Sequence, residues 1–430
     1  MFRAILGRCF SWCRLTGLAP KSLSRFPTRL LSLLLLAPVV YLRPSVWRVL
    51  VPSLSPYVLL CSAIALRSVS FTFLLSVPML LLVIWRRRFW CRRLCPVGLI
   101  SQYCGKACTR RNVFLFPVST GRFLALATLG GSLAGYPLFL WMDPLALFSG
   151  FFNITHLARP GISWLSMAGL PIVILTSLLC PGIWCSRICP LGATQDLLAL
   201  GRRMLHARKV NQRRVFPRTD SAGRRFFLAT GMGTVFSAFV SKSWAKEKRP
   251  LRPPGNVNET AFKGDCIRCG SCVRACPTGI IEPIVDSGDA AGFLVPGLRF
   301  SGPNYCLQDC NQCGNVCPTG VIRKLPLDKK NRHIIGIAEI DLSACLLVAD
   351  EECGVCMPRC PRAAIVEVFS RETYTTVVRV LRERCNGCGA CVGICPPKVV
   401  KVRAVSQVGP GRPSKTSFVT PSGTRPKLPR

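Results

Sequence analysis

The stretch CIRCGSCVRACP (266–277) contains four cysteines in twelve residues, spaced C-x2-C-x2-C-x3-C and followed by a proline. The stretch CNGCGACVGICP (385–396) repeats this spacing without change. Two variants lie between them, CLQDCNQCGNVCP (306–318) and CLLVADEECGVCMPRCP (345–361), in which only the first gap is longer. Cysteines clustered this tightly indicate metal ligation rather than a disulfide framework.

The two regular groups have the spacing of bacterial ferredoxins, in which three close thiolates hold one cubane and the fourth serves the partner cluster. We therefore expect an α+β domain with four [4Fe-4S] clusters. The sixteen predicted ligands are Cys266, Cys269, Cys272, Cys276, Cys306, Cys310, Cys313, Cys317, Cys345, Cys353, Cys356, Cys360, Cys385, Cys388, Cys391 and Cys395. Structural zinc is the alternative, but zinc takes its thiolates from two separated hairpins. The spacing leaves open whether the groups pair sequentially or nested (first with fourth, second with third), with a slight preference for the nested order.

Composition favours a membrane protein. Half of the 430 residues are apolar, and 57 basic against 19 acidic side chains give a net charge of +38. The basic residues crowd the segments that flank apolar runs, as the positive-inside rule describes for multi-spanning proteins. We therefore expect a multi-pass protein of the bacterial inner membrane with its cluster domain on the periplasmic side, and no binding of nucleic acid.

The predicted fold class is an α-helical membrane domain of four spans, with a fifth span at a twin-arginine motif, followed by an α+β polyferredoxin domain. The predicted divisions are a basic cytoplasmic N-terminus (1–29), the four-span domain (30–190), a basic cytoplasmic linker (191–225), the twin-arginine signal or anchor span (226–243), the four-cluster domain (246–400) and a basic, disordered tail (401–430).

The stretch SAGRRFFLATGMG (221–233) places Arg224 and Arg225 before an apolar run in the middle of the chain. It predicts an internal signal for the twin-arginine translocase, which exports domains that have already folded around their clusters. The alternative is an arginine pair that only stops transfer before a short helix. Whether the chain is cut after Ala245 stays open.

The N-terminal half contains a repeat. WCRRLCPVG (90–98) and WCSRICPLG (184–192) share the pattern W-C-x3-C-P-x-G. If the two copies meet, their four thiols would form one further metal or redox site. Its predicted ligands are Cys91, Cys95, Cys185 and Cys189. The alternative is that these are reduced thiols that only cap and turn the chain.

Histidine is scarce, with three in the chain, and none lies in a predicted span. No haem is therefore expected. If a quinol is oxidised here, Asp143 and His156 are the predicted acceptors of its protons. The alternatives are a helix cap at Asp143 and an ordinary surface histidine.

Both halves resemble known families. The four apolar runs and the paired W-C-x3-C-P-x-G resemble NapH-type membrane quinol dehydrogenase components. The motif RRFFLATG, the opening LRPPG (251–255) and the four cysteine groups resemble the exported ferredoxin-type proteins NapG and MauM. The chain departs from NapH-type proteins in having no cysteine at 190–225, where they carry ferredoxin motifs.

The resemblance implies an electron-transfer component, with quinol dehydrogenase activity as its enzymatic assignment. It implies electron flow from the membrane quinone pool through four clusters to a periplasmic reductase or cytochrome. The alternative is a redox-sensing or maturation protein for a neighbouring respiratory enzyme. The terminal acceptor, the quinone type and the direction of electron flow stay open.

Overall fold

Two compact units make up the computed structural model. The first comprises Met1–Arg249, Gly255–Gly297 and Asn311–Leu325, and the second Pro250–Pro254, Leu298–Cys310 and Pro326–Arg430. The structure describes residues 30–31, 34, 50–68, 74, 76–86, 88–107, 119–151, 167–180, 182–209, 220–243, 250–256, 258–285, 292–349, 351–370 and 375–404. His156 and Ala245 lie outside these residues.

The first unit is mainly helical. Its elements up to residue 243 are α5 (Pro56–Leu66), α6 (Val77–Trp85), α7 (Phe89–Arg93), α8 (Pro96–Ala107), α9 (Thr120–Leu133), the 3-10 turn η2 (Leu140–Met142), α10 (Pro144–Phe151), α12 (Gly169–Leu179), the π-helical turn η4 (Trp184–Ile188), α13 (Pro190–Lys209) and α14 (Asp220–Ser243). Proline is the first residue of α5, α8, α10 and α13. Because proline lacks an N–H group but has helical φ, it suits a first turn and interrupts a helix that arrives from before it.

These interruptions overturn the predicted membrane domain. Helices α5 and α12 have 11 residues each and α9 has 14, whereas a span needs about 20 residues. Helices α13 and α14 reach 20 and 24 residues, but charged and small polar residues interrupt their apolar sequences. Among the residues that the structure describes, no helix is both long and apolar enough to cross a membrane. The expected four spans, the fifth span at 226–243 and the multi-pass inner-membrane location inferred from them are therefore wrong.

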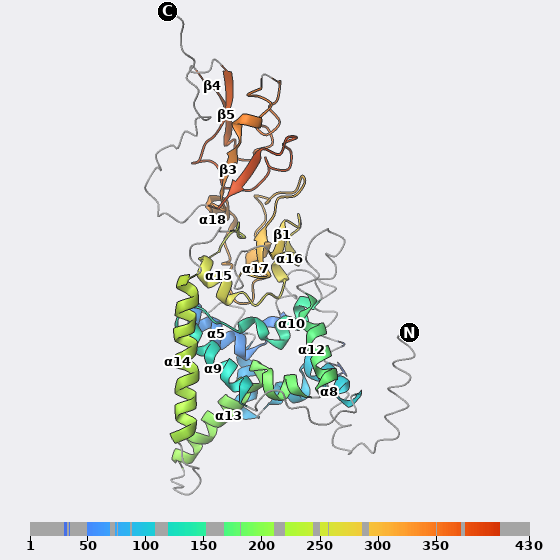
Figure 1. The fold of residues 1–430 in the computed structure, drawn as a ribbon, viewed down its shortest axis with the longest axis vertical. Coiled ribbons are helices and arrows are strands. Elements are labelled where there is room, and N and C mark those ends of the chain that lie inside the picture. The colour runs from blue at the N-terminus through green and yellow to red at the C-terminus, as the bar shows by residue number, and fades with distance from the viewer. Residues whose placement is uncertain are drawn as a thin grey trace, which may run out of the picture. The chain divides into compact units, whose positions relative to one another are not determined.

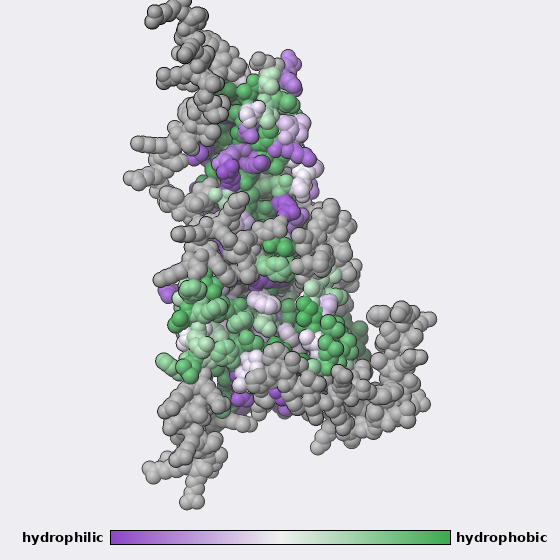
Figure 2. Space-filling model, viewed as in Figure 1, coloured by the Kyte–Doolittle hydropathy of each residue, from purple (hydrophilic) through white to green (hydrophobic). Residues whose placement is uncertain are grey.

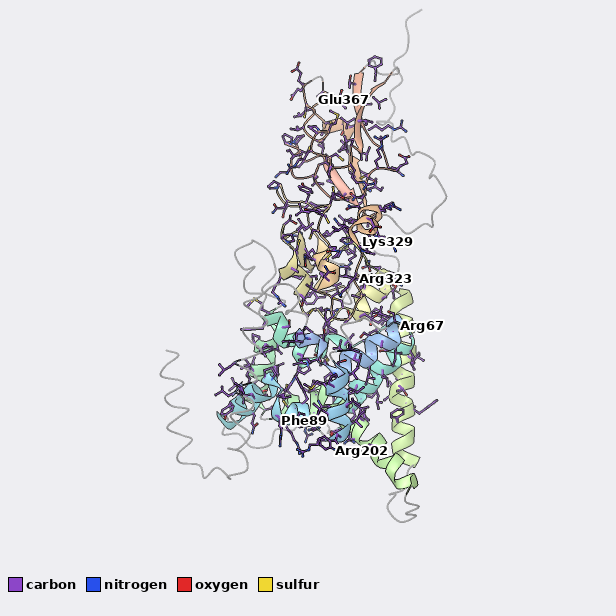
Figure 3. The ribbon with its side chains drawn as sticks, turned by 180° about the vertical axis from the view of Figure 1, so that it is seen from behind. Arg67, Phe89, Arg202, Arg323, Lys329 and Glu367 are labelled. Carbon is purple, nitrogen blue, oxygen red and sulfur yellow. The ribbon has the colours of Figure 1, made fainter. Side chains whose placement is uncertain are left out.

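The helices pack around one apolar core, whose largest fully buried side chains include Tyr57, Phe148, Leu140 and Leu191. Large apolar side chains are also exposed on α6, α12 and α14, and Figure 2 shows apolar surface in the region of α12 and α14. At one end of the unit, Arg202 of α13 donates to the carbonyls of Ile84 (3.1 Å) and Trp85 (2.6 Å), and Figure 3 labels Arg202 in this part of the helical unit.

Cysteine-rich loops and short elements follow in both units. The first unit continues with α15 (Glu259–Asp265), α16 (Ser271–Ala275), β1 (Ile281–Ile284), β2 (Val295–Leu298, whose last residue belongs to the second unit) and α17 (Gln312–Asn315). The second unit contains α18 (Leu327–Arg332), β3 (Ile337–Ile340), the 3-10 turn η5 (Leu342–Ala344), β4 (Ile365–Ser370), β5 (Thr375–Val380) and β6 (Val400–Arg403). The expected α+β character of this region agrees with the structure.

Strand β1 pairs with β2, β3 with β6 and β4 with β5. The β3–β6 pair is antiparallel and opposes Ile337 to Arg403, and the β4–β5 hairpin opposes Ile365 to Val380. Both strands of the hairpin are rich in β-branched residues, which suit a half-buried pleated surface. Because β6 ends at Arg403, residues 401–403 of the predicted tail belong to a sheet.

Helices α9 and α14 lie side by side (Figure 1) and approach each other at glycines. A Cβ atom at Gly233 would meet the backbone of Ala127, and one at Gly130 would meet the backbone of Thr230. Glycine is therefore required where the two backbones cross, despite its cost in a helix of about 1 kcal/mol relative to alanine.

We predict that Gly233→Ala lowers the melting temperature, because the clash costs roughly 1–3 kcal/mol and outweighs the gain in helix propensity. Gly231→Ala in the same helix is the matched control, since a Cβ there meets nothing within 4 Å. The control should leave the melting temperature unchanged or raise it. Equal shifts in the two variants would contradict the close approach.

Candidate iron–sulfur sites

The first cysteine group and one cysteine of the second group together surround a cavity. Cys266, Cys269, Cys272 and Cys317 line one cavity in the first unit, together with apolar side chains. The loop turns through two left-handed residues, Arg268 (φ 55°) and Gly270 (φ 70°), before α16 begins. A left-handed arginine is unfavourable by about 1 kcal/mol. Its guanidinium donates to the carbonyl of Phe293 (2.8 Å), which offsets this cost.

The fourth group has the same construction in the second unit. Cys385, Cys388 and Cys391 line a cavity with Cys360, which comes from the third group. Gly387 (φ 73°) and Gly389 (φ 84°) are left-handed at the two positions that correspond to Arg268 and Gly270. A Cβ atom at Gly387 would meet the backbone of Gly336, so the loop also packs too closely for a larger residue.

A cysteine of the fourth group, Cys395, lies close to the cysteines of the third group. Burial, and then the neighbouring thiols of Cys345, Cys353 and Cys395, raise the pKa of Cys356 to about 11. In the same way, burial and the charges of the other cavity cysteines raise the pKa of Cys272. Cavities and thiol neighbours thus associate the first group with the second and the third with the fourth, in sequential rather than nested order.

Donor chemistry and shape both suit [4Fe-4S] clusters at these cavities. Each cavity has four thiols and otherwise mostly apolar walls. In the first pair of groups, the cysteine before each proline lies close to a threonine hydroxyl. Cys276 and Thr278 are 3.5 Å apart (Sγ to Oγ1), and Cys317 and Thr319 are 3.6 Å apart. A hydroxyl this close can donate to a thiolate, and such bonds tune iron–sulfur sites.

The first cavity is anchored to the helices of its own unit. Arg274 of α16 is buried and donates to the carbonyl of Ser149 (2.8 Å) and to its hydroxyl (3.1 Å) on α10. The guanidinium of Arg268 lies 5.8 Å from the centre of the Trp141 ring. Ile267 and Cys269 belong to the same apolar core as the helices.

The repeated W-C-x3-C-P-x-G motifs also come together. Cys95 and Cys189 directly precede α8 and α13, and the N–H of Gly98 lies 3.3 Å from the Cys95 Sγ. A Cβ atom placed on Gly192 would lie 3.9 Å from the Sγ of Cys91 in the other copy. The side-chain amide of Gln195 donates to the same Cys91 Sγ at 3.2 Å. The two copies are therefore in contact through their cysteine loops.

The four thiols of the repeats interact with one another electrostatically. Burial, and then the Cys185 thiol, raise the pKa of Cys91 to about 12. Burial, and then Cys91 and Cys185, raise the pKa of both Cys95 and Cys189. The sequence did not identify Gln195, because the equivalent position in the first copy is Ser101 and the repeat gives no signal there.

Asp143 caps a helix. Its carboxylate is fully buried and accepts from the Ser55 hydroxyl (2.7 Å) and from the N–H groups of Leu145 (3.0 Å) and Ala146 (3.1 Å) at the start of α10. Burial raises its pKa to about 6, although these three bonds act in the opposite direction. Because His156 lies outside the described residues, the quinol-proton role of the pair stays a prediction. Arg224 and Arg225 lie within α14, which leaves the twin-arginine signal untested.

These cavities define the class: an iron–sulfur protein with ferredoxin-type cysteine loops. A model of a 4Fe-4S dicluster domain matches residues 265–321 and another matches 337–396. A model of a 4Fe-4S binding domain matches 68–116, 161–209 and 313–334, so both copies of the N-terminal repeat match it. The chain belongs to the family of ferredoxin-type proteins represented by NapF of Haemophilus influenzae, with 36% identity over 159 residues that cover 81% of that protein and 36% of this chain.

Two further relatives extend the comparison. Ferredoxin-type protein NapG of Escherichia coli is 32% identical over 34% of this chain, and the match spans 65% of its own length. The methylamine utilization ferredoxin-type protein MauM of Paracoccus denitrificans is 29% identical over 49% of this chain and 96% of its own length. No solved structure matches the chain. Neither the relatives nor the family models show the predicted NapH-type half.

We predict that Asp143→Asn changes how stability depends on pH. The folded pKa of about 6 exceeds the value of about 3.9 expected in the unfolded chain, so the folded state binds more protons between these values. The contribution of Asp143 to stability should therefore fall by about 3 kcal/mol as pH rises from about 4 to about 6, and then level off.

Melting temperatures of both proteins, at a fixed heating rate from about pH 4 to about pH 8, check this. Relative to the parent protein, Asp143→Asn should become more stable as pH rises through the lower half of that range. Asp143→Ala is the control, since it removes the cap as well and should be less stable than Asp143→Asn at every pH. Parallel pH profiles for the parent and Asp143→Asn would show that the carboxyl does not titrate there.

Proposed function

We propose that this protein is a multicluster electron carrier that passes single electrons through four [4Fe-4S] clusters to a protein redox partner. The observation that carries the proposal is that, in each pair, one group contributes a cysteine to the cavity of the other. Cys317 of the second group lines the cavity of the first, and Cys360 of the third lines the cavity of the fourth. In two-cluster ferredoxins the cysteine before the proline serves the partner cluster in this way.

The exchange supports an assignment of the ligand sets. The sets are Cys266, Cys269, Cys272 and Cys317; Cys345, Cys353, Cys356 and Cys395; and Cys360, Cys385, Cys388 and Cys391. The other four of the sixteen predicted ligands, identified from their motif spacing, are Cys276, Cys306, Cys310 and Cys313.

Bound clusters would supply one-electron chemistry at potentials set by burial, charge and hydrogen bonds to sulfur. The chain's own residues support that role. Buried cavity walls exclude water from the sulfur atoms, which makes each nearby charge and dipole more effective. Arg268 and Arg274 add positive charge beside the first cavity, and positive charge favours the reduced, more negative form of a cluster.

For the donor and the acceptor we propose a quinol and a reductase or cytochrome. The support is sequence-based: residues 190–225 contain no cysteine, so this segment offers no ligands for a second ferredoxin-type donor site.

We predict that alanine variants of one ligand set lose the same cluster. In the anaerobically purified full chain, Cys317→Ala and Cys272→Ala should each remove the same component of the dithionite-reduced electron paramagnetic resonance spectrum, while Cys391→Ala removes a different one. Each loss should amount to roughly four iron atoms per chain. Cys180→Ala, a half-buried cysteine outside the sets, is the control and should keep every component.

If Cys317→Ala instead removes the component lost in a variant of the third group, such as Cys356→Ala, the sequential assignment is wrong. Addition of a menaquinol or ubiquinol analogue to the oxidised protein tests the donor. Clusters that dithionite reduces but no quinol reduces would contradict the quinol assignment and favour the redox-sensing or maturation role.

A further inference from the structure

We propose that Cys91, Cys95, Cys185 and Cys189 ligate one additional iron–sulfur cluster, with two thiolates from each copy of the W-C-x3-C-P-x-G repeat. This inference is independent of the four ferredoxin-type clusters, since it rests on a different set of cysteines in the helices of the first unit. Ligation by four cysteine thiolates is the usual arrangement for both [2Fe-2S] and [4Fe-4S] clusters.

The first argument is the meeting of the two copies. Gly192 of the second copy approaches the Cys91 Sγ of the first, where a Cβ atom would lie at 3.9 Å. Gln195 of the second copy donates to the same sulfur at 3.2 Å. The two cysteines that precede the helices, Cys95 and Cys189, are both buried, and Cys91 and Cys185 are half-buried. Cys91 thus lies against the second copy of the repeat, whose equivalent cysteine, Cys185, is 94 residues further along the chain.

The second argument is the positive potential at that place. Helices α8 and α13, of 12 and 20 residues, begin directly after Cys95 and Cys189. Thiolates at helix N-termini are stabilised by the helix dipole and by the free N–H groups of the first turn. Arg88 lies near the thiols and forms an ion pair with Asp196 (2.6 Å), which fixes its position beside them. A cluster with four thiolate ligands carries net negative charge, which this surrounding stabilises.

The third argument is a set of buried polar atoms without partners. The indole nitrogens of Trp90 and Trp184, one residue before Cys91 and Cys185, are buried and make no hydrogen bond, and neither does the Oε1 of the fully buried Gln195. A buried indole N–H normally has an acceptor. The sulfur atoms of a cluster are acceptors, and each copy of the repeat supplies one such indole donor. The two unpaired indoles therefore point to a bound group that both copies contact.

Four thiolates are also the ligand set of a structural zinc site, in which the Zn–S bonds are about 2.3 Å long. Acid-labile sulfide distinguishes the two, because a cluster contains it and a zinc site does not.

The repeat cysteines share an apolar core with the first ferredoxin-type cavity. Cys95, Cys189, Trp90 and Trp184 belong to the same cluster of buried side chains as Ile267 and Cys269. A redox-capable group at the repeats would therefore share a packed, water-poor interior with the first cluster site.

Iron and acid-labile sulfide analysis of the anaerobically purified full chain tests the proposal. The double variant Cys91→Ala/Cys185→Ala should lose roughly two to four iron atoms per chain and one spectroscopic component, and keep the ferredoxin-type components. Cys61→Ala/Cys180→Ala is the matched control, with two cysteines of the same helical region outside the set. Its iron content should equal that of the parent. Unchanged iron in the Cys91→Ala/Cys185→Ala variant would overturn the proposal.

Two further measurements keep the test decisive if the double variant fails to fold. Native mass spectrometry of the unaltered protein should give a mass in excess of four [4Fe-4S] clusters, and a mass explained by four or fewer would contradict the proposal. Gln195→Leu removes the hydrogen bond to the Cys91 Sγ. It should keep the iron and shift the midpoint potential of one component to a more negative value, whereas a merely structural role would leave that potential unchanged.

Discussion

The exchange of a cysteine between neighbouring groups is the constraint on which the cluster-binding region depends. Three thiols of a group occupy one short loop, but the fourth ligand has to come from a loop 40 or more residues away in the first pair. Folding therefore has to bring the two loops together before this cavity is complete. Small or left-handed residues at two fixed positions of the loop, and the proline after the fourth cysteine, serve this requirement. A metal cluster bound in the cavity would supply folding energy, because the unfolded chain has no such cavity.

In the helical part, too, cysteines from two separate loops are brought together by folding, but the local structure differs. Here proline opens α8 and α13 directly after a cysteine, and the glycine two residues further lets the opposing loop approach. The ferredoxin-type loops obtain four ligands from two neighbouring motifs, and the helical repeat obtains four from two copies of one motif. Arg274, with its bonds to Ser149, joins the first ferredoxin-type loop to this helical framework. The helical repeat and the first ferredoxin-type cavity are thus parts of one packed unit.

Local features were predictable from the sequence and tertiary ones were not. The cysteine spacing identified the ferredoxin-type loops, because their geometry is determined within twelve residues. The pairing order was not predictable, since it depends on how strands and loops far apart in the chain assemble. The membrane spans were predicted from charge and apolar content. These quantities do not depend on where helices begin, whereas a new helix begins at each of the prolines 56, 96, 144 and 190. Gln195 was missed because the repeat carries Ser101 in its place. The cap at Asp143 was among the alternatives, but its complete burial could not be foreseen.

The central claim is that the chain holds [4Fe-4S] clusters in sequential pairs. Electron paramagnetic resonance of the full chain, purified without oxygen and reduced stepwise with dithionite, tests it most directly. Clusters that share a pair of exchanged cysteines lie close enough for their spins to interact. The account predicts [4Fe-4S] signals that broaden and split as both members of a pair become reduced, with variants of the first pair leaving the splitting of the second pair intact. A protein that contains zinc and gives no such signal, or whose signals never interact, would contradict it.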